Sequence, residues 1–425
     1  MELNLSQKGE LVTGYLKKKQ IGYLTGDGAV INETVSFDGK HYKNFAILDY
    51  LCLSTDDRLK EAAIEATKKY GLYTGVSRSY MIIDIYKEAE ELLARLFGKP
   101  VVILTRAALA HMALFPLVMG KNDAIILDHF VHATMKTASA LVKAEGTRVE
   151  VVRHNNLEKL EEKILALKNE HEKIWYCVDG IYSMQGDKTP MKELEVLLNK
   201  YDQFHLLADD SHGLSWTGKN GTGYVLNEID FHPRMVMISS LGKGFGAGGA
   251  VIVCPDENLK ENLVRFGAPL IYSGTPSPGT IGAIIASARI HLSDEIDFHQ
   301  AKLEHLMTYF TSRVQELELP VYTTAISPVN NILAGNYIFC ADITSRIKKR
   351  GYYFAPAGFP AVPVNNSSFR VVLSNYHNEE SIEELLQVIH QEYNDGLNEY
   401  GYTIDKIRSF YKLPASTKEP VLSKT

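Results

Sequence analysis

Short apolar runs alternate with longer amphipathic segments through the middle of this 425-residue chain. The apolar runs predict buried strands, and the segments between them carry apolar residues at helical spacing. The predicted strands are 101–104, 124–127, 149–152, 174–178, 205–208, 236–238 and 250–253, with helices such as 157–169 and 191–201 between them. This alternation predicts an α/β fold, in which a mostly parallel sheet is covered by helices on both faces.

The segments on either side of this region follow other patterns. Before it come a polar helix (7–20), a hairpin turning at Asp38-Gly39, an apolar segment ending at the possible N-cap Ser54, and helices 56–70 and 83–97. After it come helices 280–292 and 297–317, three short strand candidates (N-N-I-L-A-G, Y-Y-F-A-P-A and S-F-R-V-V-L-S) and a closing helix, 381–398. We therefore expect an N-terminal arm (1–55), a large domain (56–292), a small α+β domain (293–415) and a flexible tail (416–425).

Composition narrows the class of protein. The chain is 45% hydrophobic and 23% charged with a net charge of −6, so it lacks the basic excess of a nucleic-acid-binding protein. The first residues lack the apolar core of a signal peptide, and no apolar run is long enough to cross a bilayer. Four scattered cysteines suggest neither a disulfide framework nor a metal site. These features predict a cytoplasmic protein without a transmembrane segment.

One stretch between two predicted strands concentrates candidate chemistry. Residues 235–255 hold five glycines and a single cation, Lys243. Glycines leave the backbone open to a ligand, and a desolvated lysine can form a Schiff base. The alternative is an ordinary glycine turn with a solvated lysine.

Two phosphate-binding motifs do not fit this stretch. A Walker loop needs a glycine six residues before its lysine and a hydroxyl residue after it, where the chain has Met237 and Gly244. A dinucleotide fingerprint, formally present at Gly242, Gly244 and Ala247, should open a helix, whereas a strand-like run follows here.

Three further groups of polar residues fall at predicted strand ends, where ligands bind in α/β sheets. They are Asp209 and His212 in D-D-S-H-G, Asp179 and Ser183 in V-D-G-I-Y-S-M-Q-G-D, and His129 and His132 in L-D-H-F-V-H-A-T. Taken singly, each has a structural alternative: an N-cap aspartate with a surface histidine, a plain turn, or a structural histidine.

Together with Lys243, these groups resemble the α-oxoamine synthase family of fold type I pyridoxal-phosphate enzymes. The resemblance extends from about Asp49 to Leu386. Its most specific parts are D-G-x-x-S-M-x-G-D, D-D-S-H-G, S-x-G-K and R-V-V-L-S-N-Y-H.

The resemblance implies a set of catalytic and cofactor-binding residues. Lys243 would form the Schiff base with pyridoxal 5′-phosphate, and Asp209 would pair with the ring nitrogen. His212 and Ser183 would contact the ring oxygen, and His132 would stack on the ring. A carboxylate at position 209 suits this role because it keeps the ring nitrogen protonated, and a protonated ring can accept electrons from a carbanion.

Further residues are assigned by the same resemblance. Ser240 would touch the cofactor phosphate, and Ala107 and Ala108 lie in the loop beside it. The segment 272–275 matches one that reaches the phosphate of the neighbouring subunit, with Ser273 or Thr275 as candidate. That implies a homodimer with shared active sites.

The substrate-facing residues depart from the family pattern. Arg370 matches the arginine that holds the substrate carboxylate, but Asp49 replaces an asparagine and Ser368 an arginine. Arg106 and His111 stand where small or neutral residues are usual. One interpretation is that Arg106 binds the cofactor phosphate or points to solvent. The other is that Arg106, with His111 behind it, recognises a second negative charge, as in cysteate or aspartate, because a buried guanidinium needs an anion.

The family reaction condenses an amino acid with an acyl thioester, carried by coenzyme A or an acyl carrier protein, and releases carbon dioxide to give an α-amino ketone. The product would be a precursor of a sphingoid or sulfonolipid base made from serine or cysteate. Two alternatives stay open: a lyase or aminotransferase of the same fold, and a non-catalytic partner subunit.

Overall fold

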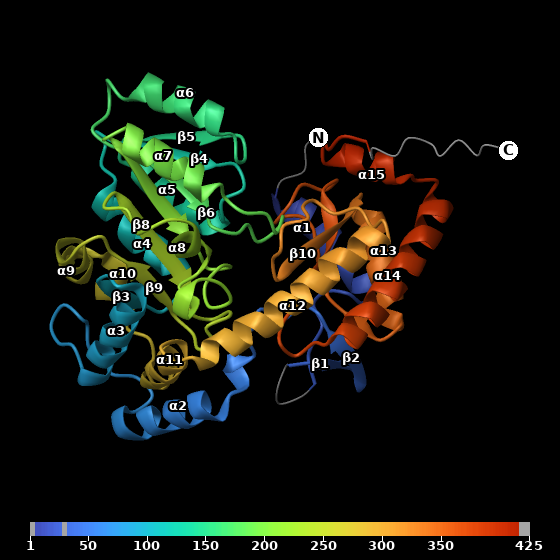
Figure 1. The fold of residues 1–425 in the computed structure, drawn as a ribbon, viewed down its shortest axis with the longest axis horizontal. Helices are drawn as coiled ribbons and strands as arrows, with labels where there is room; N and C mark the ends of the chain where they lie inside the picture. Colours follow the sequence, from blue (N-terminus) through green and yellow to red (C-terminus); the bar gives the residue numbers. More distant parts are fainter. Residues whose placement is uncertain (1–4, 28–31, 416–425) are drawn as a thin grey trace. The chain divides into compact units, whose positions relative to one another are not determined.

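The computed structural model describes residues 5–27 and 32–415, and the chain divides into two compact units (Figure 1). The larger unit comprises Asp49–Ser183 and Lys188–Lys302, and the smaller unit comprises the segment up to Leu48, Met184–Asp187 and the chain from Leu303 onward. The predicted N-terminal arm, 1–55, is thus divided: its part up to Leu48 belongs to the same unit as the C-terminal region, whereas residues 49–55 belong to the larger unit. The predicted tail, 416–425, lies outside the described residues.

A seven-stranded sheet forms the centre of the larger unit (Figure 1). Its strand order is β3-β9-β8-β7-β6-β4-β5. The strands are β3 (Val101–Leu104), β4 (Ala124–Asp128), β5 (Arg148–Val152), β6 (Ile174–Asp179), β7 (Phe204–Asp209), β8 (Met235–Ser240) and β9 (Ala250–Val253). All neighbours pair in parallel except β9, which is antiparallel to both β3 and β8. The predicted α/β fold with a mostly parallel sheet is confirmed.

Helices cover this sheet because its strands are apolar on both faces. Alternate residues such as Leu127, Cys177 and Leu207 join a buried cluster with α4 (Ala107–Val118) and α5 (Ala133–Ala144). Beyond the sheet, α2 (Asp57–Tyr70) packs closely on α11 (Pro278–His291), where a Cβ on Gly282 would lie 2.3 Å from the carbonyl oxygen of Ala62. The other helices of the larger unit are α3 (Asp84–Phe97), α6 (Leu157–Leu167), α7 (Met191–Lys200), α8 (Tyr224–Glu228), α9 (Glu257–Phe266) and α10 (Ala268–Tyr272).

Helix α2 begins two residues later than Ser54 would place it. Asp56 is its N-cap and accepts a hydrogen bond from the backbone N–H of Arg58. Ser54 instead lies in a 3-10 turn, Leu53–Thr55. The aspartate carboxylate also carries the charge that favours a helix N-terminus, which explains why it takes the cap position.

The smaller unit contains two three-stranded sheets. One is antiparallel, with β10 (Val329–Gly335), β13 (Ser367–Val372) and β12 (Ala355–Ala357) in that order. The other pairs β1 (Thr34–Phe37), β2 (Lys40–Asn44) and β11 (Tyr352–Tyr353). The predicted strand Y-Y-F-A-P-A is therefore split between two sheets. The helices of this unit are α1 (Leu5–Lys18), α13 (Tyr337–Lys349), α14 (Glu379–Tyr400) and α15 (Ile404–Phe410), and α12 (Glu295–Glu316) begins in the larger unit and ends in this one.

Candidate functional site

Three polar side chains lie at one edge of the central sheet because the carboxyl ends of parallel strands meet there. Asp179 ends β6 and is paired in register with Asp209, which ends β7, and Ser240 ends the neighbouring β8. Leu104 at the end of β3 reaches the same edge, since it pairs with Ala250, which in turn pairs with Ser240. The predicted residues on separate strands are thus brought together by topology alone.

Asp209 is a buried carboxylate that keeps its charge. Its Oδ1 accepts a hydrogen bond from the backbone N–H of Ser211 at 3.0 Å, and its Oδ2 lies 3.2 Å from Nε2 of His111. The latter contact is electrostatic rather than a well-aligned hydrogen bond. Burial by itself would raise the pKa of Asp209, but the contact with His111 and the charge of Lys243 hold that pKa well below its ordinary value.

Asp179 shows the opposite behaviour although it lies directly beside Asp209. Its Oδ1 accepts the backbone N–H of His132 at 3.1 Å. Burial, followed by the negative charge of Asp209, raises the pKa of Asp179 well above its usual range. The pKa values of the two adjacent buried carboxylates are therefore shifted in opposite directions, and Asp209 is the member of the pair that favours its charged form.

His132 is held as a neutral ring at the start of α5. It is the N-cap of that helix, and its Nδ1 accepts from the backbone N–H of Thr134 at 3.3 Å. Burial is the main reason that the pKa of His132 is lowered. Both His132 and the neighbouring candidate from the same motif, His129, are exposed on the described chain. His132 differs in that its ring is held at a helix N-terminus, and a fixed imidazole suits the predicted stacking role.

His212 is oriented by a residue that the sequence interpretation missed. The hydroxyl of Tyr50 lies 2.6 Å from Nδ1 of His212, and both side chains are buried. The indole N–H of Trp216 donates to the carbonyl of His212 at 2.6 Å. Tyr50 stands next to Asp49, whose carboxylate accepts from the backbone N–H and hydroxyl of Ser54 at 3.1 and 2.5 Å.

The loop that carries Lys243 is closed by its own backbone. Leu241 donates to Gly249 at 3.0 Å, and Gly246 donates to the carbonyl of Lys243 at 2.9 Å. Gly246 and Gly249 have φ angles of 75° and 84°, which only glycine adopts at little cost. Lys243 is half-buried here, and its charge influences Asp209, Asp179 and His132.

A helix N-terminus lies at the same edge of the sheet. Helix α4 begins at Ala107, directly after β3, and no side chain caps it. Its first N–H groups therefore point out of the helix, and such groups bind phosphate. Ala107 and Ala108 contribute these groups, whereas the hydroxyl of Ser240 accepts from the backbone N–H of Gly242 at 3.3 Å.

Arg106, the N-cap residue of α4, is exposed, and its Nη1 donates to the carbonyl of Thr105 at 3.1 Å. This exposure agrees with the interpretation in which Arg106 points to solvent, and His111 does not lie behind it. His111 is fully buried and faces Asp209 instead. Residues 106 and 111 are five positions apart, which is not a whole number of turns of about 3.6 residues, so their side chains leave α4 in different directions.

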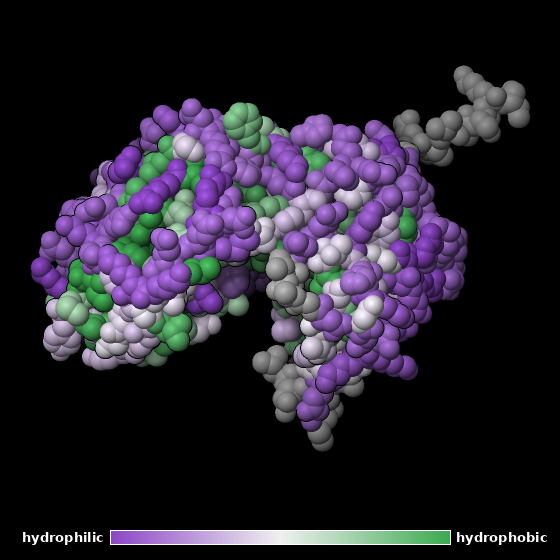
Figure 2. Space-filling view, turned by 90° about the horizontal axis from the view of Figure 1, so that it is seen from below, coloured by the Kyte–Doolittle hydropathy of each residue, from purple (hydrophilic) through white to green (hydrophobic). Residues whose placement is uncertain are grey.

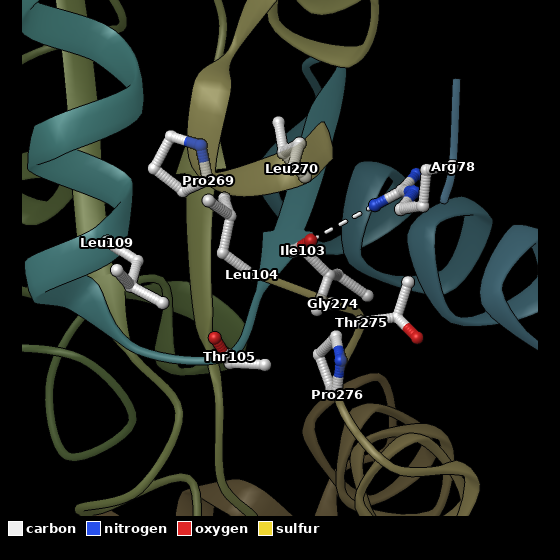
Figure 3. A pocket seen from close by; sticks show the side chains of 10 residues that line it. All are labelled: Arg78, Ile103, Leu104, Thr105, Leu109, Pro269, Leu270, Gly274, Thr275 and Pro276. Carbon is white, nitrogen blue, oxygen red and sulfur yellow. Dashed lines mark hydrogen bonds between the residues drawn. The ribbon is translucent and has the colours of Figure 1, made fainter. Parts of the chain in front are cut away.

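The segment after α10 supplies one buried and one exposed hydroxyl. Thr275 is buried and accepts from the hydroxyl of Tyr86 at 3.1 Å, whereas Ser273 is exposed. Thr275 also borders a narrow pocket, which the close-up in Figure 3 shows between β3, α4 and residues 269–276. Neither Lys243 nor Asp209 is among its lining residues.

A buried ion pair stabilises the wall of this pocket. Nη2 of Arg78 lies 2.7 Å from Glu90, and Nη1 donates to the carbonyl of Ile103 at 3.0 Å (Figure 3, dashed line). Glu90 in turn accepts the backbone N–H of Ile103 at 2.9 Å. The pair therefore fixes the end of β3 just before the loop that leads to α4.

Arg370 lies in the smaller unit, on the central strand of its antiparallel sheet. It pairs in register with Asn331 of β10 and Ala355 of β12, and its side chain is half-buried. Ser183, the remaining candidate, is half-buried in the turn after β6 in the larger unit. All predicted cofactor-binding residues thus belong to the larger unit, and only Arg370 comes from the smaller one.

The chemistry of this set fits pyridoxal 5′-phosphate. A lysine amine can hold the aldehyde, a buried anionic carboxylate can hold a protonated ring nitrogen, and an uncapped helix N-terminus can hold the phosphate. Among residues 5–27 and 32–415, no group of histidine, cysteine and acidic side chains is arranged to bind a metal ion. In the same part of the chain, no helix is long and apolar enough to cross a membrane.

Comparison with known proteins agrees with this chemistry. Residues 40–389 match the family model "Aminotransferase class I and II". The chain is 30% identical to 8-amino-7-oxononanoate synthase of Methylobacillus flagellatus over 84% of its length and 88% of that protein. It is 29% identical to the enzyme of the same name from Salmonella arizonae, over 83% of this chain and 90% of that one.

A solved structure of serine palmitoyltransferase from S. paucimobilis with bound PLP shares the fold. Its TM-score is 0.84 at 19% identity, with 93% of this chain and 99% of that chain covered. The fold, the family model and the sequence relatives lead to one conclusion: the chain belongs to the α-oxoamine synthase family of pyridoxal-phosphate-dependent acyltransferases.

Proposed function

We propose that the residues gathered at the carboxyl edge of the central sheet are the active site of a decarboxylative condensation between an amino acid and a fatty acyl thioester. The observation that carries this proposal is the arrangement around Asp209, a buried anionic carboxylate beside Lys243 and at the same sheet edge as an uncapped helix N-terminus. Pyridoxal 5′-phosphate, when bound, supplies an electron sink for the carbanion that forms at the amino-acid Cα.

Each residue then has a defined task. Lys243 would hold the cofactor covalently, and its amine, when free, would move the proton at the amino-acid Cα. Asp209 would hold a proton on the ring nitrogen. His132 would contact the ring, and His212, oriented by Tyr50, would bind the ring oxygen together with Ser183.

The phosphate end is proposed to lie at the start of α4. The N–H groups of Ala107 and Ala108 and the hydroxyl of Ser240 would bind it. Arg106 is exposed at this helix end, so it is free to contribute a charge either to the phosphate or to an anionic substrate side chain.

Arg370 is proposed to bind the substrate carboxylate with two parallel hydrogen bonds, which a lysine would not provide. If Arg106 binds a second negative charge, cysteate or aspartate is preferred over serine, alanine and glycine. With serine or cysteate and a long acyl chain, carried by coenzyme A or an acyl carrier protein, the product is a sphingoid or sulfonolipid base precursor. Asp49, which contacts Ser54, would act on the substrate only through the position of Tyr50.

The test is a titration of cysteate, aspartate, serine, alanine and glycine into wild type and Arg106→Ala, followed by the absorbance of the bound cofactor. Loss of a charge-assisted contact should lower the affinity for cysteate roughly 10- to 100-fold and leave alanine unchanged. If Arg106→Ala weakens the cofactor instead, Arg106 is a phosphate ligand.

A lyase or aminotransferase would use the same residues, because the carbanion can be protonated instead of acylated. Release of carbon dioxide that depends on an added acyl thioester separates the proposed reaction from both. A non-catalytic partner subunit would show neither release nor a covalent link to Lys243. A cytoplasmic location remains a prediction from the sequence.

We further propose that two copies of the chain form a homodimer with shared active sites. The larger unit carries exposed apolar side chains, among them Leu72, Tyr80, Phe266 and Tyr272. Green patches also interrupt the purple surface on the face that Figure 2 shows. Because Thr275 is buried within its own chain, Ser273 is the better candidate to reach the phosphate of the partner.

Light scattering at micromolar concentration tests the dimer. Subunit mixing tests the shared site: Lys243→Ala and Ser273→Ala chains are each impaired, and their mixture should regain part of the activity in sites that carry both native residues. A monomer, or a mixture without recovery, contradicts the proposal.

A further inference from the structure

The contact between His111 and Asp209 has no counterpart in the roles assigned above. His111 lies on α4, and Asp209 ends β7, so a helix and a strand far apart in the sequence meet at this point. His111 is completely buried, and its Nε2 is 3.2 Å from Oδ2 of Asp209. A polar ring at a fully buried position calls for a specific partner, and Asp209 is the one within reach.

The contact runs through one of the two ring nitrogens. Nε2 of His111 lies 3.2 Å from Oδ2 of Asp209, and within the described part of the chain neither Nε2 nor Nδ1 makes a well-aligned hydrogen bond. An imidazole can present an N–H group to a carboxylate, so His111 can stabilise the charged form of Asp209 at this distance.

Comparison with the neighbouring carboxylate, Asp179, shows what the contact with His111 changes. Asp179 and Asp209 are paired in register on adjacent strands, and both are buried. Asp179 accepts a backbone N–H from His132, and Asp209 accepts one from Ser211, so main-chain donors do not distinguish them. His111 touches Asp209 alone.

We propose that His111 is a positioning residue that places the single negative charge of this carboxylate pair on Asp209 rather than on Asp179. The proposal rests on the proposed function, in which Asp209 binds the ring nitrogen of pyridoxal 5′-phosphate. Other charged groups also act on the pair. Lys243 lowers the pKa of both aspartates, whereas the charge of Asp128, at the end of β4, raises the pKa of Asp179 and so acts in the same direction as His111. Asp210, directly after β7, and His132, the N-cap of α5, are titratable neighbours of Asp209, and Tyr182 is one of Asp179.

A cofactor analogue isolates this effect from folding. Deaza-pyridoxal phosphate has carbon in place of the ring nitrogen, so its binding does not report on the charge of Asp209. The measurement is the ratio of the dissociation constants of the analogue and the natural cofactor, obtained by titrating the apoprotein. A general loosening of the site would weaken the binding of both ligands and leave this ratio unchanged. The ratio also does not depend on turnover.

His111→Leu should lower the preference for the natural cofactor roughly 10- to 100-fold, and His111→Gln, which keeps a neutral N–H donor, should restore most of it. In the His111→Leu background, Asp179→Asn should recover part of the preference, since it removes the competing site for the charge. Phe115→Leu, one turn further along α4 and edge-on to His111, is the control for lost packing and should leave the ratio unchanged.

The two proposals fail in different ways. If Asp209→Asn leaves the ratio unchanged, Asp209 is not the partner of the ring nitrogen, and the proposed function of this residue is wrong. If Asp209→Asn abolishes the preference but His111→Leu does not change it, only the role of His111 is overturned. An equal loss in His111→Leu and Phe115→Leu would likewise overturn it, because packing alone would account for the effect.

Discussion

Two buried aspartate–histidine pairs lie at the carboxyl ends of strands in the same sheet, and they differ in how completely the aspartate is satisfied. The carboxylate of Asp128, which ends β4, lies 2.9 Å from Nδ1 of His154. It also accepts hydrogen bonds from the backbone N–H groups of Phe130 and Asn155 at 2.8 and 2.9 Å, and from the hydroxyl of Tyr176 at 3.2 Å.

Within the described residues, the carboxylate of Asp209, at the end of β7, contacts only the ring of His111 and accepts one hydrogen bond, from the backbone N–H of Ser211. A carboxylate has about four lone-pair positions, so Asp128 is saturated and Asp209 keeps capacity for a further donor. The two pairs share residue types, and this remaining capacity distinguishes the pair proposed to bind the ligand from the structural one.

The largest expected effect comes from Lys243, the residue that identifies the Asp209 pair as the functional one. Lys243→Ala should lower turnover by at least about 10²–10⁴-fold, because the covalent attachment and the mobile proton are both lost. Borohydride reduction followed by peptide mass spectrometry should place the cofactor on Lys243 in wild type. Full activity of the variant would remove the reason for calling the Asp209 pair functional.

Exchanging each aspartate for asparagine compares the pairs directly. Asp209→Asn should bind cofactor but lower the rate roughly 10²–10³-fold, since a neutral amide cannot hold the protonated ring nitrogen as a carboxylate does. Asp128→Asn should instead lower the free energy of unfolding by about 2–4 kcal/mol and leave the rate per folded molecule near that of wild type. Kinetics and urea denaturation of both variants provide the check, and a reversal of the two results would invalidate the comparison.

Acid stability tests whether Asp128 is charged. Burial opposes its charge, but the hydrogen bond with His154 lowers the pKa of Asp128 below its ordinary value. A lowered pKa stabilises the fold above about pH 4 and this stabilisation is lost as the pH falls further. The unfolding free energy of Asp128→Asn should therefore depend less steeply on pH between about 5 and 3. An unchanged slope would mean that Asp128 and His154 do not form a charged pair.

The smallest effect is expected at Tyr50, whose hydroxyl contacts His212 in the proposed site. Tyr50→Phe removes the 2.6 Å contact to Nδ1 of His212 and should lower the rate about two- to tenfold, the effect of one neutral hydrogen bond. Melting temperature serves as the control, because a large drop would show that Tyr50 acts on folding. A rate equal to that of wild type would mean that Trp216 and packing suffice to orient His212.

Much of this protein could be predicted from its sequence. The alternation of apolar runs and amphipathic segments located every strand of the central sheet to within about two residues, because buried strands and their covering helices impose local periodicities. The strand-end positions of Lys243, Asp209 and His132 followed from the same pattern, since chain order determines which residues come directly after a strand.

Only the tertiary structure decided what these residues contact. The interpretation of His111 as a substrate-facing charge failed because the sequence shows its neighbours on α4 but not β7, which brings Asp209 to 3.2 Å. Tyr50 meets His212 across 162 positions, and Asp179 meets Asp209 through strand pairing. Such contacts depend on sheet order and helix placement, which arise from burial of the whole chain, whereas local periodicity constrains only the elements themselves.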